Sequence, residues 1–140
     1  MIKNLLSSSP ALKEYGFAFI RITIGILMIC HGFPKIMGGV ATWQFLGSTM
    51  ANLGIHLWPT FWGFCAACAE FFGGFALTLG LGTRIASAFL TFTMIVAFLM
   101  HWNKGDAFQV YSAALTLLFV FIGLFIAGGG KYSLDSYLKR

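Results

Sequence analysis

The chain has 140 residues, of which 59% are hydrophobic and only 9% are charged. A soluble domain contains about 25% charged residues, so this composition excludes an ordinary water-soluble globule. The formal net charge of +5 does not indicate nucleic-acid binding, because the basic residues form no stripe with polar surface between them. Most of them lie at the ends of apolar segments, where they can contact anionic headgroups. We therefore expect a single domain, residues 1–140, embedded in the lipid bilayer.

Residues 1–16 are not typical of a cleavable signal peptide, because their apolar run is shorter than the ~7–15 residues required. Residues 1–12 are expected to form an interfacial or loose arm. The first membrane span is predicted over about residues 15–33, where only Arg21 and His31 interrupt the apolar sequence. Pro34 is expected to end this helix, since proline disfavours the helical conformation at the residue before it.

Residues 36–58 contain Gly, Asn and Trp at intervals that suit a short interfacial or re-entrant helix. Trp43 and Trp58 are interpreted as aromatic anchors at the membrane surface. Three more spans are predicted over about residues 59–82, 85–102 and 108–127, where apolar runs are separated by short polar turns. The sequence therefore predicts an all-α fold, a transmembrane four-helix bundle.

The predicted topology follows from the basic residues. An even number of spans places both termini on one side of the membrane. That side collects Lys3, Lys13, Arg84, Lys131, Lys139 and Arg140, whereas Lys35 and Lys104 lie opposite. Because loops rich in Lys and Arg stay inside the cell, both termini are predicted to be cytoplasmic.

Glu70 lies near the middle of the second span, where an ionised side chain costs ~2.5–3.5 kcal/mol on insertion scales. Such a residue normally faces the bundle interior, and helical periodicity places Glu70 on a face of small residues. Arg21 is the predicted partner, because its side chain can cover most of the roughly 8 Å difference in depth. The pair is interpreted either as a structural contact or as a proton-relay or substrate-binding site, and both readings stay open.

His31 and His101 are expected at a similar depth near the outer membrane boundary, on different helices. Such a pair could ligate haem or a metal, serve a quinone headgroup or transfer protons, or only bond to lipid headgroups. Of the chemical alternatives, a quinone-like or proton-handling role is preferred, and no metal site is predicted. Cys65 and Cys68 have C-x-x-C spacing, but they lie inside an apolar span and point away from Glu70 by helical rotation. They are interpreted as small apolar fillers.

Several segments together resemble the DoxX family. They are RITIGILMICHGFPKIMG at 21–38, AEFFGGFALTLGLGTR at 69–84, the end of the third span with His101, and GGGKYSLD at 128–135. The resemblance covers nearly the whole chain and implies a compact four-helix bundle in a bacterial inner membrane. It places at the family's polar positions Arg21, His31, Lys35, Glu70, Arg84 and His101. Many relatives carry a glutamate early in the fourth span, where this chain has Tyr111-Ser112.

The resemblance also implies a function, because family members commonly bear the name oxidoreductase and relatives include a subunit of an archaeal thiosulfate:quinone oxidoreductase. We predict a multi-pass inner-membrane protein that handles quinone or electrons for a membrane-associated oxidoreductase partner. No flavin, nicotinamide or iron–sulfur motif is present in the sequence, so quinone is the candidate cofactor and any other electron carrier belongs to a partner. The residues assigned to the chemistry are Glu70, Arg21, His31 and His101, and those assigned to substrate binding are Lys35 and Arg84.

Two other classes of function stay open. One is a non-catalytic membrane scaffold or small-molecule-binding protein, in which the Arg21–Glu70 pair is structural. The other is a minimal transporter, which needs a polar path between the two faces of the bundle. A homo-oligomer is also compatible with the glycine-rich helix faces.

Overall fold

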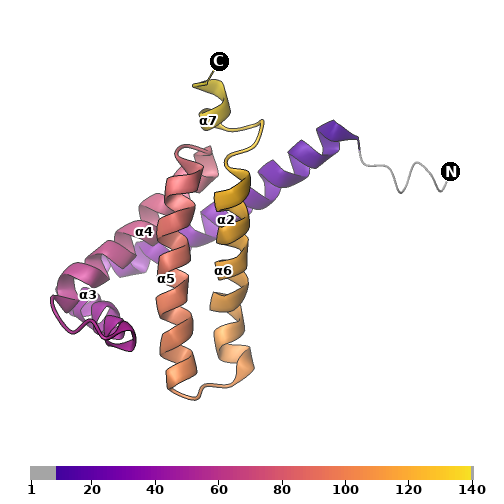
Figure 1. Ribbon diagram of the computed structural model, residues 1–140. Coiled ribbons are helices and arrows are strands. Elements are labelled where there is room, and N and C mark those ends of the chain that lie inside the picture. The colour runs from indigo at the N-terminus through magenta and orange to yellow at the C-terminus, as the bar shows by residue number, and fades with distance from the viewer. Residues whose placement is uncertain (1–8, 140) are drawn as a thin grey trace.

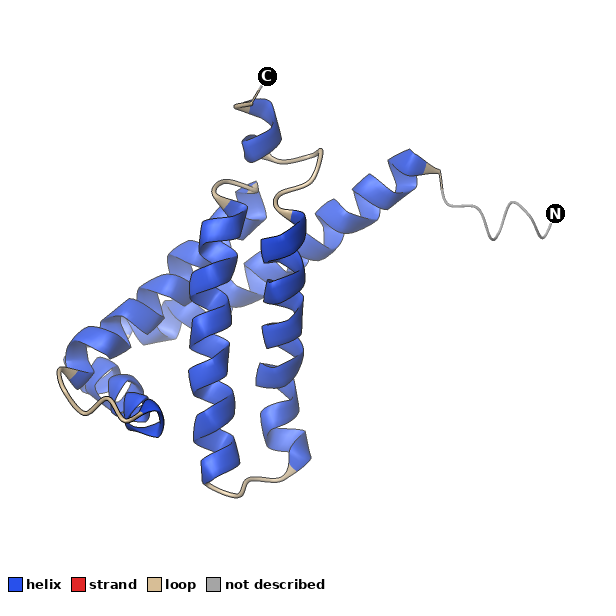
Figure 2. Ribbon diagram, in the orientation of Figure 1, coloured by secondary structure: helices blue, strands red, loops and turns tan. Residues whose placement is uncertain are grey.

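The computed structural model describes residues 9–139 and is helical throughout (Figures 1 and 2). The long helices are α2 (Pro10–Met37), α4 (Pro59–Leu79), α5 (Thr83–Asn103) and α6 (Phe108–Ala127). The short ones are α3 (Gly39–Ser48), the 3-10 helix η1 (Thr49–Leu53) and α7 (Leu134–Tyr137). The described residues contain no strand, and the four long helices are apolar enough to cross a membrane. The prediction of an all-α, four-span membrane bundle is therefore confirmed.

The bundle is built from two antiparallel pairs of long helices. Helices α5 and α6 stand side by side, and α2 and α4 cross them obliquely (Figure 1). The two pairs meet in a core made mainly of Met28, Leu77, Leu90, Met94 and Phe121. Most other large apolar side chains are exposed on the outside of the bundle, as expected for helices that face lipid tails.

Glycines set the register between α2 and α4. A Cβ atom on Gly25 would lie 2.7 Å from the backbone nitrogen of Thr78, and one on Gly32 would lie 2.7 Å from the Cα of Phe71. Neither position can carry a side chain, so the two backbones approach closely, which is the usual contact of membrane helices rich in small residues. The register pairs the middle of α2 with the end of α4, and the end of α2 with the middle of α4.

The first span is longer than its sequence predicts. Helix α2 begins at Pro10, inside the predicted arm, and the rest of that arm lies mostly outside the described residues. The helix then continues through Pro34 to Met37, so the expected end before Pro34 is wrong. Proline removes its own N–H donor and crowds the carbonyl one turn before it, but the Pro34 carbonyl still accepts from the N–H of Gly38 at 2.9 Å. The close contact at Gly32 fixes this part of α2 against α4, and the chain turns only at Gly39, whose φ is +65°.

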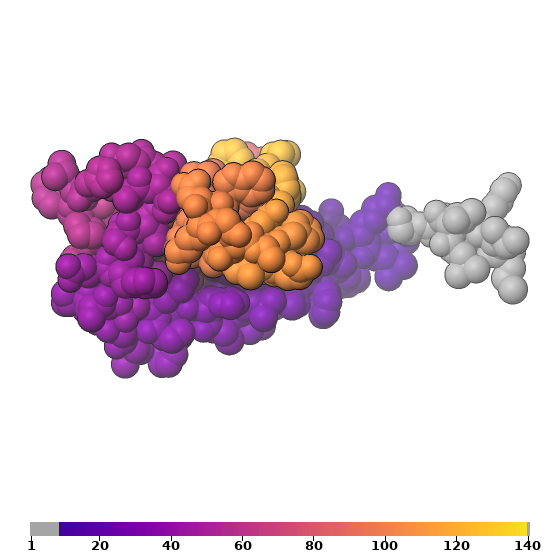
Figure 3. Space-filling model, turned by 90° about the horizontal axis from the view of Figure 1, so that it is seen from below, coloured from indigo at the N-terminus to yellow at the C-terminus, as the bar shows by residue number. Residues whose placement is uncertain are grey.

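Helix α3 and η1 fold back against α4, which gives residues 36–58 a definite structure. Gly63 on α4 lies against the carbonyl of Trp43, and Gly47 on α3 lies against the carbonyl of Pro59, with no room for a Cβ at either position. Beyond α3, the Asn103 side chain donates a 2.9 Å hydrogen bond to the Asn52 side chain and ties η1 to the end of α5. In Figure 3 the α3–η1 segment lies beside the loop end of α5 and α6.

The C-terminal segment, residues 128–139, closes the other end of the bundle. Asp135 accepts hydrogen bonds from the N–H groups of Gly82 and Thr83 at 2.7 and 2.9 Å, and its own N–H donates to the carbonyl of Gly80. The segment therefore caps the turn between α4 and α5. The first and last described residues lie toward this end (Figure 1), and its assignment to the cytoplasm stays a prediction.

Candidate functional site

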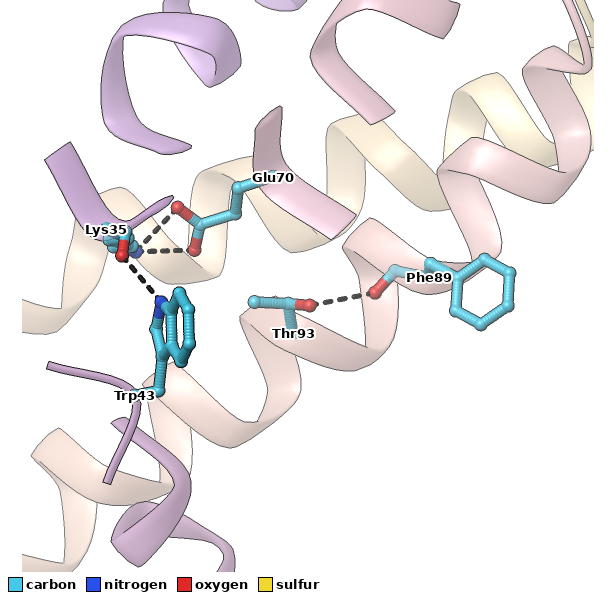
Figure 4. Close-up of polar contacts among 5 residues, drawn as sticks. All are labelled: Lys35, Trp43, Glu70, Phe89 and Thr93. Atoms are coloured by element: carbon cyan, nitrogen blue, oxygen red, sulfur yellow. Dashed lines mark hydrogen bonds and ion pairs between the residues drawn. The ribbon is translucent and has the colours of Figure 1, made fainter. Parts of the chain in front are cut away.

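Glu70 is the buried carboxylate of the bundle, with 2% of its surface exposed. Its partner is Lys35, whose Nζ lies 2.6 Å from Oε1 and 2.5 Å from Oε2 (Figure 4). The prediction that Arg21 pairs with Glu70 is wrong. Glu70 does have a cationic partner from the first span, as the cost of a charge in an apolar medium requires. That partner is in the last turn of the helix rather than near its middle.

The register of α2 against α4 explains the exchange of partners. Gly32 lies against the backbone of Glu70 and Phe71. Lys35 follows it by about one turn, so its side chain is within reach of the Glu70 carboxylate. Arg21 precedes Gly25 by one turn and is level with the carbonyls of Leu77 and Thr78. The step from Glu70 to Thr78 is about 12 Å along the helix axis. The first span predicted from the sequence ends at Pro34, so that prediction does not place Lys35 on the same helix as Arg21.

Arg21 holds together the end of α4 and the C-terminal segment. Its guanidinium is 1% exposed and donates to the carbonyls of Leu77, of Thr78 at 3.0 Å and of Tyr132 at 2.7 Å. Free carbonyls at a helix C-terminus attract cationic donors, and the planar guanidinium presents several N–H groups at once. This geometry makes Arg21 a structural clamp, separate from the Glu70 carboxylate.

A cavity of about 880 Å³ lies between α4, α5 and the α3–η1 segment. Its wall is almost entirely apolar, and Lys35 and Glu70 lie in it. Arg84 and His101 border it as well, so one cavity brings together four of the six predicted site residues. Its other lining side chains include Phe61, Trp62, Phe89, Phe92 and Met100. Cys65 also borders this cavity; helical rotation predicted that it points away from Glu70, but the cavity is wide enough to reach it.

Two further residues position the site, and the sequence analysis gave them no such role. The indole Nε1 of Trp43 donates a 2.9 Å hydrogen bond to the Lys35 carbonyl and so fixes the end of α2 against α3. Thr93 on α5 borders the cavity, and its hydroxyl donates to the carbonyl of Phe89 at 3.0 Å (Figure 4). The Thr93 oxygen keeps lone pairs that can accept a bond from a bound molecule.

His101 forms a polar contact where the cavity reaches the loop between α5 and α6. Its Nδ1 lies 2.7 Å from Oδ2 of Asp106, and both side chains are partly exposed. The carboxylate favours the imidazole tautomer with the proton on Nδ1, which leaves Nε2 as an acceptor. Asp106 has no role in the sequence analysis, because acidic residues are common in short polar turns such as the one between α5 and α6.

The remaining predicted residues are more peripheral. His31 is exposed on α2 and does not border the cavity, so the structure does not bring it into the same site as His101. Arg84 is exposed near the start of α5, and its guanidinium donates to the Ile126 carbonyl at 3.2 Å. Within residues 9–139 no three His, Cys, Asp or Glu side chains gather as a metal site would require.

The four apolar helices, with one buried ion pair facing an apolar cavity, define a small multi-pass helical membrane protein. Residues 16–102, more than half of the chain, match the DoxX family. The chain belongs to the DoxX family.

Named relatives match most of the chain's length. This chain is 33% identical over 132 residues to "Inner membrane protein YqjF" of Escherichia coli strain K12. The aligned region covers 92% of this chain and 96% of that protein. The chain is 30% identical over 127 residues to "Putative oxidoreductase CatD" of Bacillus subtilis strain 168, covering 91% and 90% of the two chains. "Inner membrane protein YphA" of E. coli strain K12 is 32% identical over 123 residues, covering 82% and 84%. No solved structure gives a significant match.

Proposed function

We propose that this chain binds a quinone in the cavity beside Lys35 and Glu70 and acts as a quinone-handling subunit of an oxidoreductase system in the inner membrane. The observation that carries the proposal is a buried, hydrogen-bonded ion pair that faces an otherwise apolar cavity. A quinone has the matching chemistry, because it is a flat apolar ring with carbonyl oxygens that accept hydrogen bonds. The relative named as an oxidoreductase supports the same reading.

The two charged side chains have complementary roles in this proposal. Nζ of Lys35 has three N–H donors, more than its contact with one carboxylate uses, so it can also donate to a quinone oxygen. The Glu70 carboxylate is the nearby proton acceptor or, once protonated, the donor. Reduction of a quinone to a quinol takes up two electrons and two protons. Glu70 supplies or receives one proton, the second proton is exchanged with water, and the two electrons pass to or from a partner oxidoreductase.

A second reading is a membrane scaffold, in which the Lys35–Glu70 pair only joins α2 to α4. The clamp at Arg21 favours it, because that buried cation donates to three backbone carbonyls and so serves a structural contact. The two readings differ in what removal of the pair does. A scaffold needs the pair for stability alone, whereas a quinone site needs it for binding.

The test is quinone binding by the purified protein in lipid nanodiscs, followed by quenching of tryptophan fluorescence. Trp62 borders the cavity and Trp43 contacts Lys35, so a bound quinone ring quenches both. The key variant carries Lys35→Met and Glu70→Met together, because replacing both partners by apolar residues of similar length keeps the packing. Lys104→Met in the exposed α5–α6 loop is the matched control.

We expect wild type and the control to bind a quinone, and the double variant to lose about tenfold or more in affinity while it still accumulates as a folded protein. Unchanged affinity in a folded double variant would contradict the quinone site and favour the scaffold. The absence of binding to wild type would contradict it as well.

A further inference from the structure

The cavity beside the ion pair continues into a second one. The second cavity has a volume of about 460 Å³ and runs between α4 and α5 toward the turn that joins them. Cys65, Ala69, Ile85 and Phe89 line both cavities, so the two form one continuous groove. From Glu70 to the end of α4 at Leu79 the groove follows about 14 Å of helix.

Small residues on α4 create this groove. Ala69, Gly73 and Ala76 follow one another at helical spacing and line the second cavity. A Cβ atom on Gly73 would lie 3.3 Å from the Leu90 side chain, so α4 and α5 touch there and the floor of the groove is closed. Its rim is formed by Phe72 and Phe89, which are 60% and 61% exposed. Exposed apolar side chains in a membrane-spanning segment face lipid, so the groove opens sideways into the bilayer.

Most polar groups of the groove line its first cavity, which contains Lys35, Glu70, Thr93 and His101. Arg84 borders the first cavity too, near the start of α5, where its guanidinium donates to the Ile126 carbonyl. The second cavity is lined by apolar residues and glycines together with the thiols of Cys65 and Cys68. An occupant of the whole groove therefore has a polar headgroup at the ion pair and an apolar chain that runs away from it along α4.

We propose that the second cavity holds the first part of the isoprenoid tail of a quinone, so that the ligand is a long-chain, lipid-soluble quinone that enters sideways between Phe72 and Phe89. This inference rests on the proposed quinone site and names the substrate class of that site. A tail in the groove contacts α4 and α5 on one side and lipid on the other. The ring then lies against Lys35 and Glu70 without having to cross the membrane surface.

Cys68 offers a way to separate the tail site from the headgroup site, because it lines the second cavity and not the first. We would compare wild type, Cys68→Phe and Ala113→Phe, the last being an exposed position on α6 that borders neither cavity. Each protein is titrated in nanodiscs with a tail-less benzoquinone and with the same ring bearing a short isoprenoid tail. Both quinones are compared at equal concentration in the membrane.

We expect Cys68→Phe to weaken binding of the tailed quinone by about tenfold or more, since a larger side chain in a packed contact typically costs ~1–3 kcal/mol. Binding of the tail-less ring and all binding by Ala113→Phe should change by less than about threefold, the usual effect of a surface substitution. An equal loss for both quinones would overturn the inference, because the ring itself would then occupy the second cavity. No loss for either quinone would also overturn it.

A second measurement distinguishes a quinone tail from a membrane lipid. A quinone with a photoreactive group on its tail should label peptides around Cys68 and Phe89, and labelling should fall when unlabelled tailed quinone is added. Labelling of α6 instead would overturn the inference. So would a photoreactive phospholipid that labels the groove and is not displaced by the quinone. If wild type binds neither ring, the proposed function itself fails; if it binds the ring but the tail makes no difference, only the tail site fails.

Discussion

Nζ of Lys35 lies 2.5 Å from Oε2 of Glu70, although Lys35 follows a proline that interrupts the hydrogen bonding of its own helix. The contact joins α2 to α4 at mid-depth in the bundle. The Lys35 side chain is 30% exposed and that of Glu70 only 2%. An unpaired Glu70 carboxylate would therefore cost more free energy than an unpaired Lys35 ammonium, which water can reach. This asymmetry gives the two single variants different outcomes.

We expect Lys35→Met to destabilise the protein more than Glu70→Gln, because it leaves a buried carboxylate without a cation. A loss of about 1–3 kcal/mol is expected for Lys35→Met, smaller than for a fully buried pair. The measurement is the thermal unfolding temperature of the detergent-solubilised protein. Replacing both residues by Met should restore part of the loss, and a double variant less stable than either single one would contradict this account.

Arg21→Met should release the C-terminal segment. The substitution removes three hydrogen bonds from a buried guanidinium, and we expect a loss of about 2–4 kcal/mol. Trypsin then cuts faster after Lys131, which adjoins the clamped Tyr132 carbonyl. Arg84→Met removes an exposed arginine with one weak contact and serves as the control. If both variants are cleaved at the wild-type rate, Arg21 does not hold the segment.

The cap at Asp135 should depend on pH. Burial alone raises the pKa of the Asp135 carboxyl, but the N–H donors of Thr83 and Gly82 outweigh it, so that pKa lies below its ordinary value. The cap therefore stabilises the fold fully above the ordinary pKa of ~3.9, and its contribution is lost as the pH falls through the lower pKa of the folded state. The amide NMR shifts of Gly82 and Thr83 should titrate with a midpoint below ~3.9. Asp135→Asn should abolish this titration; a midpoint above the ordinary value would refute the cap.

Gly63→Ala should separate α3 from α4. The added methyl group meets the Trp43 carbonyl, and backbone cannot yield as a flexible side chain does. We expect a loss of about 1–3 kcal/mol, the usual cost of overpacking. A Cβ on Gly123 of α6 meets no atom within 4 Å, so Gly123→Ala should be neutral or stabilising by ~0.5–1 kcal/mol through helix propensity. Thermal unfolding of both variants is the measurement, and equal stability would show that the α3–α4 contact is loose.

Long apolar runs made the four spans predictable, because an apolar segment in lipid must form its hydrogen bonds internally as a helix. The need of Glu70 for a cationic partner was predictable for the same reason. The identity of the partner was not. It depends on the register that Gly25 and Gly32 impose and on the passage of α2 through Pro34, and both are properties of the packed pair of helices. Asp106 and Asp135 lie in polar turns, where the sequence alone does not distinguish a structural carboxylate from a solvated one.

The hydrogen-bond acceptors of Arg21 are synthesised at different times. Arg21 enters the membrane with the first helix, but the Tyr132 carbonyl that accepts from it is made 111 residues later. Until Tyr132 is made, the guanidinium lacks one of its acceptors. A chain cut before Tyr132 would keep α2, α4, α5 and α6 and still lack the contact that joins Arg21 to the C-terminal segment.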